Sequence, residues 1–348
     1  MTVAYFCLGA LDLLGEIPQL SPKTSQECID WIYAQQIHPV EDSDDAMKTA
    51  HCGFRGGPSL GAPYSPQAST PVHRFDNAHI TMTYTALASL LILRDDLSRV
   101  DKSAITNALR QLQQSDGRQG TTRQSTDDGA LRIDARIDES DMRFLYCACV
   151  ISYILNDWRG IDQDKAVRYI IQSQSYESAF GQGPGQEAHG GSTYCAVASL
   201  QLLGKLHLLP RRDDLVYWLL SRQKDGFNGR PNKASDTCYS FWVGATLQML
   251  GAYQFVDTVA LKAFLQLTHS KHGGFGKEAG DHPDLLHSYL GLSGIAIAKL
   301  SPDVHPLNTA LGLSRDTEAY LKTTSAWSNS GDTLDGITKR LESTSIES

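Results

Sequence analysis

The chain of 348 residues has no basic surplus and no long hydrophobic run. Its net charge of −8 argues against a nucleic-acid-binding protein, because such proteins usually carry a basic patch or stripe. No apolar run approaches the roughly 20 residues that a membrane-spanning helix needs. The apolar stretch from Val3 to Leu11 is preceded by no Lys or Arg, so it lacks the basic start of a secretory signal, and we expect a core helix there. The sequence therefore predicts a protein with no membrane span and no nucleic-acid partner.

The seven cysteines are not the even set of a disulfide framework. Five of them lie in apolar stretches of helical character, which is typical of free thiols in a reducing compartment. We therefore expect a cytoplasmic protein. The chain also lacks the alternation of polar and apolar residues that marks β-strands, and its hydrophobic content of 41% is sufficient for a helical core.

Glycine-rich turns divide the chain into repeats. After each turn come a short polar loop and a helix that is apolar nearly all round, so that it should be buried on most sides. We expect these buried helices at about 77–93, 141–155, 189–204, 236–251 and 284–299. Amphipathic helices should lie between them at about 24–35, 102–114, 161–173, 211–223 and 256–268. The clearest turns are 53–57, 180–183, 226–229 and 273–276.

The repeat has a regular period. Asp141, His189, Asp236 and Asp284 open successive buried helices at spacings of 48, 47 and 48 residues. A pair of helices in each repeat of this length indicates a stacked all-α array. Buried helices that alternate with amphipathic ones predict an inner ring inside an outer ring, an α–α toroid, although an open solenoid would have the same period.

The domain organisation follows from where the repeat stops. We expect a single toroid domain at 1–315, then a C-terminal helix and a Ser/Thr-rich disordered tail within 316–348. A loop at 38–76 and a polar insertion at 117–138 interrupt the pattern.

Three residues of metal-binding type occupy related positions in two repeats. Asp236 and Cys238 should lie in the first turn of one inner helix and His287 in the first turn of the next, so their side chains should converge. A carboxylate, a thiolate and an imidazole are zinc ligands, and three protein ligands leave a fourth position open, as in catalytic sites. The alternative is a helix cap, a core thiol and a surface histidine.

Cationic and polar side chains gather at the same mouth of the array. The group consists of His189, Arg230, Lys233, Tyr239 and Lys277. Helix N-termini with added cations bind anions, in particular phosphate or diphosphate. Each cation alone would be an ordinary solvated charge. Beside a metal site they predict a diphosphate pocket, and the combination suggests alkylation of a thiol by an allylic diphosphate.

Several segments resemble the β subunits of protein prenyltransferases. The resemblance runs from about Thr2 to Leu300 and is strongest at 189–195, 229–242 and 282–287. The segments 77–100 and 141–144 are most similar to the type I geranylgeranyl-transferring members. The resemblance implies an α–α toroid built from prenyltransferase-type helix pairs.

The resemblance also implies roles for individual residues. Asp236, Cys238 and His287 would bind zinc, with the cysteine of a substrate's C-terminal C-a-a-X box as the fourth ligand. That thiolate would attack C1 of geranylgeranyl diphosphate, and Tyr239 and Lys277 would complete the catalytic group. The residues implied in diphosphate and isoprenoid binding are Thr2, Tyr146, His189, Gly190, Gly191, Arg230, Lys233, Tyr239 and Trp242. Those implied in peptide binding are His79, Arg143, Phe144 and Leu286.

Two positions indicate the longer lipid donor. Lys277 stands where farnesyl-transferring members carry an aspartate that helps to bind magnesium, so magnesium should not be required. Thr2 aligns with a bulky tryptophan of those members, and its smaller side chain leaves room for a fourth isoprene unit. Thr81 replaces a smaller residue of the peptide pocket, which would narrow the choice of terminal residue. Members of the family also have a segment before the position of Thr2, so the chain is either truncated there or begins with a different first helix.

The resemblance further implies an obligate heterodimer with a prenyltransferase α subunit. The expected substrates are C-a-a-X proteins with a terminal Leu, such as Rho-type small GTPases. Two other interpretations stay open. One is a farnesyltransferase or Rab-type geranylgeranyltransferase β subunit. The other is a non-catalytic helical-repeat scaffold, although a scaffold has no need of Asp, Cys and His at matched repeat positions.

Overall fold

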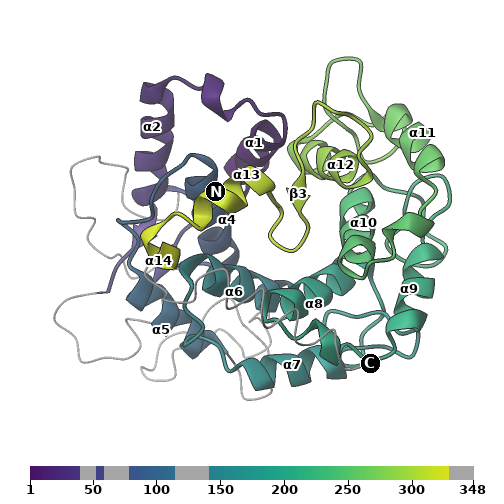
Figure 1. The fold of residues 1–348 in the computed structure, drawn as a ribbon, viewed down its shortest axis with the longest axis horizontal. Helices are drawn as coiled ribbons and strands as arrows, with labels where there is room; N and C mark the ends of the chain where they lie inside the picture. Colours follow the sequence, from purple (N-terminus) through teal and green to yellow (C-terminus); the bar gives the residue numbers. More distant parts are fainter. Residues whose placement is uncertain (40–51, 59–77, 114–140, 329–348) are drawn as a thin grey trace, which may run out of the picture.

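The computed structural model describes residues 1–39, 52–58, 78–113 and 141–328 (Figure 1). In it the glycine-rich turns are hydrogen-bonded to the starts of the inner helices that follow them, and we call each such unit a staple. In each staple, the carbonyl of the turn's phenylalanine accepts a hydrogen bond from the N–H of the residue that opens the next inner helix. Burial of the phenylalanine ring removes apolar surface from water and fixes the turn against the core. The pairs are Phe54 with His79, Phe180 with His189, Phe227 with Asp236 and Phe275 with Asp284.

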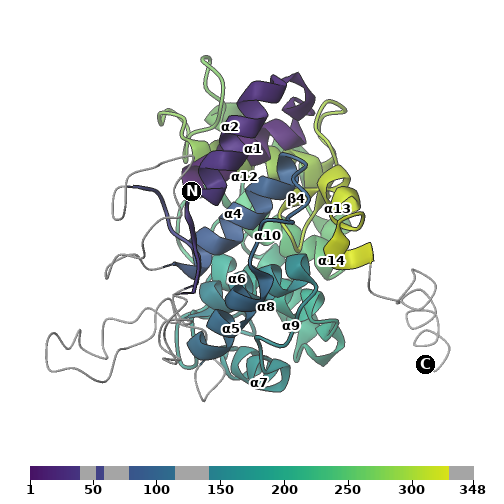
Figure 2. The ribbon, with the colours of Figure 1, turned by 90° about the vertical axis from the view of Figure 1, so that its left-hand side faces the viewer.

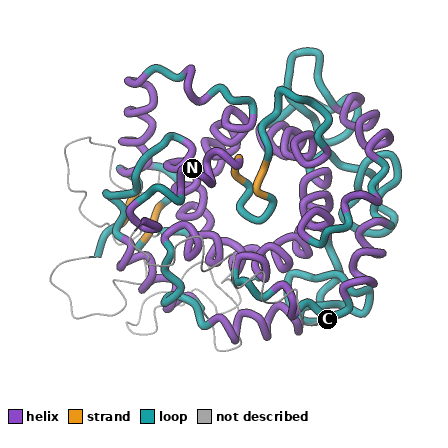
Figure 3. The backbone as a smooth tube through the Cα atoms, in the orientation of Figure 1, coloured by secondary structure: helices purple, strands orange, loops and turns teal. Residues whose placement is uncertain are grey.

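Inner helices form a closed ring. Within the described residues the ring runs in the order α1 (Thr2–Leu13), α4 (Ile80–Ile92), α6 (Met142–Leu155), α8 (Gly190–Leu202), α10 (Tyr239–Met249) and α12 (Leu285–Ala298). Each helix contacts the next, and α1 contacts both α4 and α12 (Figure 3). The array is therefore a toroid and not an open solenoid.

Amphipathic helices lie outside this ring, as the charge pattern predicted. They are α2 (Pro22–Tyr33), α5 (Lys102–Leu112), α7 (Gln163–Gln172), α9 (Arg212–Leu220) and α11 (Thr258–Thr268). Short 3-10 helices, η1 (Ile17–Gln19), η3 (Leu206–Leu208) and η4 (Tyr253–Phe255), lead into some of them. Asp and Ser side chains cap several outer helices, as at Asp257, whose carboxylate accepts from the N–H groups of Val259 and Ala260.

Consecutive repeats are also joined at the start of each inner helix. At α6, α8 and α10, a backbone N–H at or just before the helix start donates to a carbonyl in the loop of the next repeat, which sets neighbouring helix starts side by side. The bonds run from Met142 to Gln182, from Gly190 to Gly229 and from Thr237 to Lys277, at 2.9, 2.9 and 3.0 Å.

A hairpin enters the centre of the ring and was not predicted. Strands β3 (Leu307–Asn308) and β4 (Leu313–Ser314) pair antiparallel, and the loop between them points into the toroid (Figures 1 and 3). Tyrosines on four inner helices hold the hairpin by their hydroxyl groups. Tyr5 and Tyr289 donate to the Gly312 carbonyl, Tyr146 to Ala310 and Tyr194 to Thr309.

Strands β1 (Gln36–Ile37) and β2 (Gly53–Phe54) form a second small antiparallel pair. The absence of alternation in the sequence predicted no strands, and this was wrong for both pairs. Strands of two residues are too short to produce an alternating pattern. The interrupting loop at 38–76 lies mostly, and the insertion at 117–138 wholly, outside the described residues.

The C-terminal elements pack against the inner helices α4 and α6, at one end of the ring. Helix α13 (Arg315–Leu321) follows β4, and α14 (Ser325–Ser328) lies next to it (Figure 2). Asp12 is buried in α1 and accepts hydrogen bonds from Ser314 N–H and Thr317 Oγ1, which joins the two ends of the described chain. The predicted disordered tail falls almost entirely at 329–348, outside the described residues.

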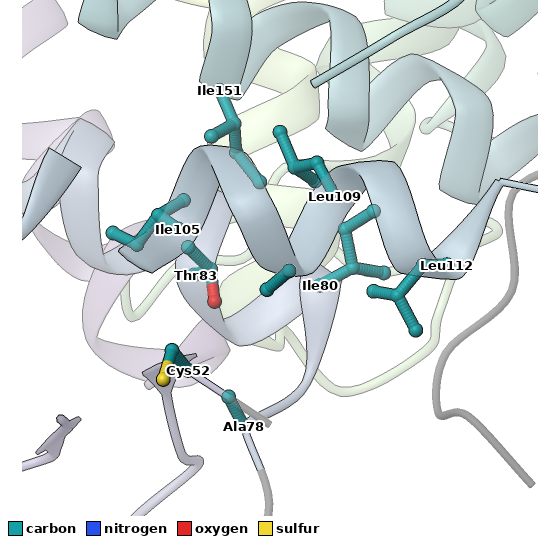
Figure 4. Close-up of a pocket in the computed structure, with 9 residues that line it drawn as sticks. Cys52, Ala78, Ile80, Thr83, Ile105, Leu109, Leu112 and Ile151 are labelled. Atoms are coloured by element: carbon teal, nitrogen blue, oxygen red, sulfur yellow. The ribbon is translucent and has the colours of Figure 1, made fainter. Parts of the chain in front are cut away.

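A small apolar pocket lies between α4, α5 and α6 (Figure 4). Ile80, Ile105, Leu109 and Ile151 contribute to its lining, together with the buried thiol of Cys52. Among the helices of the described residues, none is long and apolar enough to cross a membrane.

Candidate metal centre

Asp236 and Cys238 lie just before α10, at the edge of the inner ring. We predicted both in the first helical turn, and this was wrong, because the helix begins at Tyr239. The preceding residues form a tight turn in which Tyr239 N–H donates to Asp236 O and Ser240 N–H to Thr237 O, at 3.0 and 3.1 Å. Such i to i+3 bonds are of the 3-10 type. The turn directs both side chains toward the next repeat.

His287 lies in the first turn of α12, as predicted, and Asp284 orients its ring. Asp284 Oδ1 accepts the backbone N–H of His287 at 2.9 Å, and Asp284 Oδ2 lies 2.6 Å from His287 Nδ1. A contact to Nδ1 leaves Nε2 as the ring nitrogen available for a metal. The sequence predicts only that Asp284 opens a helix, and it does not predict this contact. An Asp three residues before a His at a helix start is the sequence pattern that indicates it.

The three candidate ligands converge. One ligand atom from each of Asp236, Cys238 and His287 lies within 4.8 Å of the others. His287 Nε2 is 3.4 Å from Asp236 Oδ1, and Cys238 N–H donates to that oxygen at 2.9 Å. A carboxylate, a thiol and an imidazole with a free Nε2 match zinc in donor type and in number. These residues therefore fit a divalent metal of the zinc class.

The electrostatics of the three groups depend on one another. Burial raises the pKa of the Cys238 thiol, and the Asp236 carboxylate raises it further. Burial also opposes ionisation of Asp236, but hydrogen bonds from His287 and Cys238 outweigh it, and the net pKa of Asp236 is lowered. The hydrogen bond to Asp236 raises the pKa of His287 despite partial burial. A thiol beside a carboxylate stays protonated at neutral pH, so binding to a cation must displace its proton.

His189 and Tyr239 form a second polar pair at the same mouth. His189 Nδ1 accepts Gly191 N–H at 3.0 Å, so the neutral ring carries its proton on Nε2, which lies 2.9 Å from the Tyr239 hydroxyl. Burial and the nearby Arg230 guanidinium lower the pKa of His189. Burial raises the pKa of the Tyr239 phenol, with further contributions from Cys238 and Asp236. Both groups are therefore neutral at pH 7, and the hydroxyl of Tyr239 keeps a proton that it can donate.

Two glycines make the space that the Tyr239 ring occupies. A Cβ at Gly229 would lie 2.1 Å from Tyr239 Cζ, and one at Gly190 would lie 3.2 Å from Tyr239 Cδ1. The backbones of the two glycines are also hydrogen-bonded to each other. The ring can approach this closely only because both side chains are absent.

Two of the expected cations near the pair, Arg230 and Lys277, have acidic partners. Arg230 Nη1 lies 2.8 Å from Glu187 Oε2, and Lys277 Nζ lies 2.9 Å from Glu278 Oε1. The pKa of Lys277 is raised, first by Glu278 and then, more weakly, by Asp236. Lys233 lies in the exposed loop after Arg230. The sequence predicted the cations without these partners, because isolated charges carry no signal of pairing.

Aromatic side chains continue from the mouth into the ring. Tyr194 contacts Trp242 and Phe241, with ring centroids 5.0 and 4.9 Å apart, and Tyr146 contacts Tyr194 at 5.3 Å. Tyr146 and Trp242 thus belong to one aromatic wall. Gly191, at the top of α8, lies against the His189 ring.

The residues assigned to the peptide pocket are only partly brought together. His79 and Phe144 meet edge to face at 5.9 Å, and Arg143 lies over the Phe144 ring while it pairs with Asp141. Leu286 is on α12, beside the metal-ligand candidate His287, where it packs against the main core.

The two threonines singled out in the sequence both lie near α4. Thr2, the first residue of α1, contacts Met82, with Oγ1 3.5 Å from Sδ. Thr81 lies against Cys147, with Oγ1 3.8 Å from Sγ.

Comparison with known proteins shows to which family the chain belongs. Residues 1–313 match the prenyltransferase alpha-alpha toroid domain. The chain is 40% identical over 324 residues to the geranylgeranyl transferase type-1 subunit beta of Dictyostelium discoideum, an alignment that covers 90% of this chain and 88% of the relative. The chain belongs to the prenyltransferase β-subunit family, on the type-1 geranylgeranyl transferase branch.

Other members of this prenyltransferase family agree. The geranylgeranyl transferase type-1 subunit beta of Arabidopsis thaliana is 35% identical over 326 residues, covering 90% of this chain and 81% of the relative. The solved structure of Candida albicans protein geranylgeranyltransferase-I complexed with GGPP superposes with a TM-score of 0.76, covering 93% and 91% of the two chains. At 24% identity, that likeness supports the fold alone. The predictions of an α–α toroid and of a prenyltransferase enzyme are confirmed.

Proposed function

We propose that this chain is the catalytic subunit that transfers a geranylgeranyl group from geranylgeranyl diphosphate to the cysteine thiol of proteins ending in C-a-a-X. The observation that carries the proposal is the convergence of Asp236, Cys238 and His287 from consecutive repeats. The names of the type-1 relatives, and the GGPP in the Candida complex, support the choice of lipid. A metal-binding set at matched repeat positions also favours an enzyme over a scaffold.

In this proposal Asp236, Cys238 and His287 hold one zinc ion. The zinc would keep the sulfur of the substrate cysteine in the thiolate form near neutral pH. Asp236 is suited to the site because its lowered pKa keeps it ionised, and carboxylate oxygens have lone pairs to spare beyond the bond from Cys238 N–H. Lys277 would supply the positive charge that offsets the diphosphate, so magnesium would not be required.

The chemical step is a displacement at C1 of the lipid. The cysteine sulfur forms a bond to C1 while the bond from C1 to oxygen breaks, and the electron pair leaves with the diphosphate. Tyr239 donates from its hydroxyl, and His189 holds that hydroxyl through Nε2. Arg230 and Lys233 add positive charge, and Arg230 must exchange Glu187 for the diphosphate. Exposed ion pairs are worth only about 0–1 kcal/mol, so this exchange costs little.

The remaining predicted residues would bind the two organic substrates. Tyr146 and Trp242 offer aromatic surface to the isoprenoid, with Gly190 and Gly191 allowing its close approach to α8. Thr2 would leave room at the far end of the lipid. His79, Arg143, Phe144 and Leu286 would shape the site for the last substrate residue, typically Leu, and Thr81 would narrow it.

The biological setting completes the proposal. The chain would act in the cytoplasm as an obligate heterodimer with a prenyltransferase α subunit, on C-a-a-X proteins such as Rho-type small GTPases. Residues 1–315 would form the catalytic toroid, with the C-terminal helix and tail at 316–348.

Co-expression with an α subunit tests the proposal. The purified complex should contain about one zinc per β chain. It should prefer geranylgeranyl over farnesyl diphosphate in a competition with a C-a-a-L peptide, and should not need added magnesium. Farnesyl preference with strict magnesium dependence would contradict the choice of lipid. A metal-free complex whose function survives Cys238→Ala would instead identify a scaffold.

A further inference from the structure

Both carboxylate oxygens of Asp284 contact the same residue, His287. Oδ1 accepts the backbone N–H of His287 at 2.9 Å, and Oδ2 contacts Nδ1 of the same residue at 2.6 Å. The other openers of inner helices among the described residues bond two residues ahead. Asp141 accepts Arg143 N–H and His189 accepts Gly191 N–H. Asp284 therefore differs from them in that its second oxygen reaches a side chain of metal-ligand type.

The backbone of Asp284 is held in place by the glycine-rich turn before it. Its N–H donates to Phe275 O at 3.2 Å, and Phe275 N–H donates in turn to Ser288 Oγ at 3.0 Å. Gly274 leaves room for that hydroxyl, because a Cβ there would lie 2.6 Å from Ser288 Oγ and its φ is +77°. These contacts fix the carboxylate relative to α12, so it can fix the His287 ring.

Two carboxylates compete for the proton of that ring. Asp284 Oδ2 is 2.6 Å from Nδ1, whereas Asp236 Oδ1 is 3.4 Å from Nε2. A neutral imidazole carries one N–H, which goes to the stronger acceptor contact. With Asp284 present, the proton sits on Nδ1 and the lone pair of Nε2 faces Asp236 and Cys238. Without it, Asp236 would draw the proton to Nε2, where the nitrogen has no lone pair for a metal.

We propose that Asp284 is a positioning residue that selects the His287 tautomer and ring orientation needed to hold the metal. The inference rests on the proposed function in taking Asp236, Cys238 and His287 as metal ligands. Asp284 itself is not one of the three converging ligand residues. Its side chain is 52% exposed at the mouth, against 14% for His287, so replacing it disturbs little packing.

The test separates metal affinity from helix capping in the intact heterodimer. In Asp284→Asn the side-chain carbonyl can still accept His287 N–H, so the cap is kept. The amide NH₂ group then faces Nδ1 and favours the wrong tautomer. Zinc affinity, measured by competition with a chromogenic chelator, should fall about 10–100-fold, as is typical when outer-shell partners of a metal-binding histidine are lost. The melting temperature of the metal-free protein should not change.

Asp257→Ala is the matched control. Asp257 caps the outer helix α11 through two backbone bonds and has no role in the site. This variant should lower the melting temperature and leave zinc affinity unchanged.

The outcomes distinguish a failure of the proposed function from a failure of the role proposed for Asp284. A wild-type complex that binds no stoichiometric zinc would overturn the proposed function. A wild-type complex that binds zinc, together with an Asp284→Asn variant of equal affinity, would overturn only the role of Asp284. Equal losses of affinity in the Asp284 and Asp257 variants would show that general destabilisation, and not the His287 tautomer, is responsible, and would also overturn that role.

Discussion

The openings of α8 and α10 occupy the same place in consecutive repeats but are built differently. At α8, His189 caps Gly191, and Thr193 N–H bonds His189 O at 2.9 Å, which is a regular helical bond. At α10, the matched residues are Asp236 and Cys238, and the chain makes a 3-10 turn before the helix begins. In the proposed function one opening becomes part of an anion site, and the other supplies two of the three candidate metal ligands.

The difference follows from how many hydrogen-bond acceptors each opener has. A neutral histidine has one acceptor nitrogen, and His189 uses it on the helix cap. A carboxylate has about four lone-pair sites, so Asp236 can accept Cys238 N–H and still offer lone pairs to a metal. The repeat thus places the two helix starts in equivalent positions, and the residue type at each start determines how many hydrogen-bond acceptors remain for a ligand.

The altered turn also has a structural cost. At α8, Thr193 Oγ1 accepts the N–H of Phe180 in the turn before the helix. The matched Ser240 Oγ in α10 is buried without a hydrogen-bond partner, as far as the described residues show. A buried unpaired hydroxyl costs roughly 1–3 kcal/mol. The opening that carries the candidate metal ligands therefore lacks a hydrogen bond that the α8 opening has.

Removing the thiol at the α10 opening should have the largest effect. Cys238→Ala deletes a metal ligand, so zinc affinity should fall by more than the roughly 10–100-fold expected for outer-shell changes, and prenyl transfer should be lost with it. Metal analysis after gel filtration checks this. Cys149→Ala, which removes a buried thiol from α6, is the control and should retain the metal. Stoichiometric zinc in Cys238→Ala would refute the site.

Adding a methyl group where the two openings meet should have the second-largest effect. Gly229→Ala places a Cβ about where the Tyr239 ring lies, so the ring must move away from His189. Overpacking of this kind costs about 1–3 kcal/mol, and denaturant unfolding should show a loss of that size together with reduced turnover. The Cβ of Gly57→Ala would meet no atom of the described residues within 4 Å, so this variant is the control and should be neutral. Equal stability of the two variants would contradict the packing described for Tyr239.

The pH dependence of metal binding should distinguish the two openings. The pKa values of Cys238 and His287 are raised, so metal must displace a thiol proton throughout pH 6–8 and, toward the acidic end, an imidazolium proton as well. Asp236 has a lowered pKa, is ionised over this range and adds no slope. Zinc affinity should rise with pH by about tenfold per unit, more steeply at the acidic end. Chelator competition across this range measures the slope.

His189 supplies the control for that slope. Its pKa is lowered, so it is neutral over most of the range and belongs to the α8 opening. His189→Gln should therefore leave the slope of zinc affinity against pH unchanged, even where turnover falls. A flat profile in the wild type, or a slope that His189→Gln abolishes, would contradict the assignment of the protons to α10 and α12.

The smallest effect should come from the hydroxyl that joins the openings. Tyr239→Phe removes one hydrogen bond to His189 and should lower the free energy of unfolding by about 0.5–1.5 kcal/mol. Tyr217→Phe is a suitable control, because that ring is 76% exposed on α9. Matching denaturation curves for the two variants would show that the Tyr239 hydroxyl contributes nothing to the folded state.

The sequence predicted the features that recur in every repeat, and it did not predict the local departures from the repeat. Its period was enough to place Asp236, Cys238 and His287 at one mouth, because equal spacing puts matched residues side by side. The helix start at Tyr239 was mistaken because a 3-10 turn and an α-helical turn have the same residue preferences over so few positions. The sequence did not predict that Asp284 orients His287, because an aspartate that only caps a helix and one that also contacts a histidine side chain look alike in sequence.

The hairpin and the ion pairs were missed for a different reason. The tyrosines that hold the hairpin are up to 307 residues from their acceptors, as for Tyr5 and Gly312. The pairing of Arg230 with Glu187 crosses from one repeat to the next. Contacts at such separations leave no local pattern, and they become visible only when the ring is closed.

Closure of the ring has a consequence for biosynthesis. Helix α1 packs against α12, and the Tyr5 hydroxyl donates to the carbonyl of Gly312, which is synthesised 307 residues later. At the usual 5–20 residues per second, a ribosome takes about 15–60 s to make the intervening chain. For most of that time α1 lacks its second inner neighbour, α12, and the tyrosines of the ring centre lack the hairpin that they bond. The apolar inner face of α1 therefore stays uncovered on one side until α12 and the hairpin have been made, and transiently exposed surface of this kind is prone to aggregate.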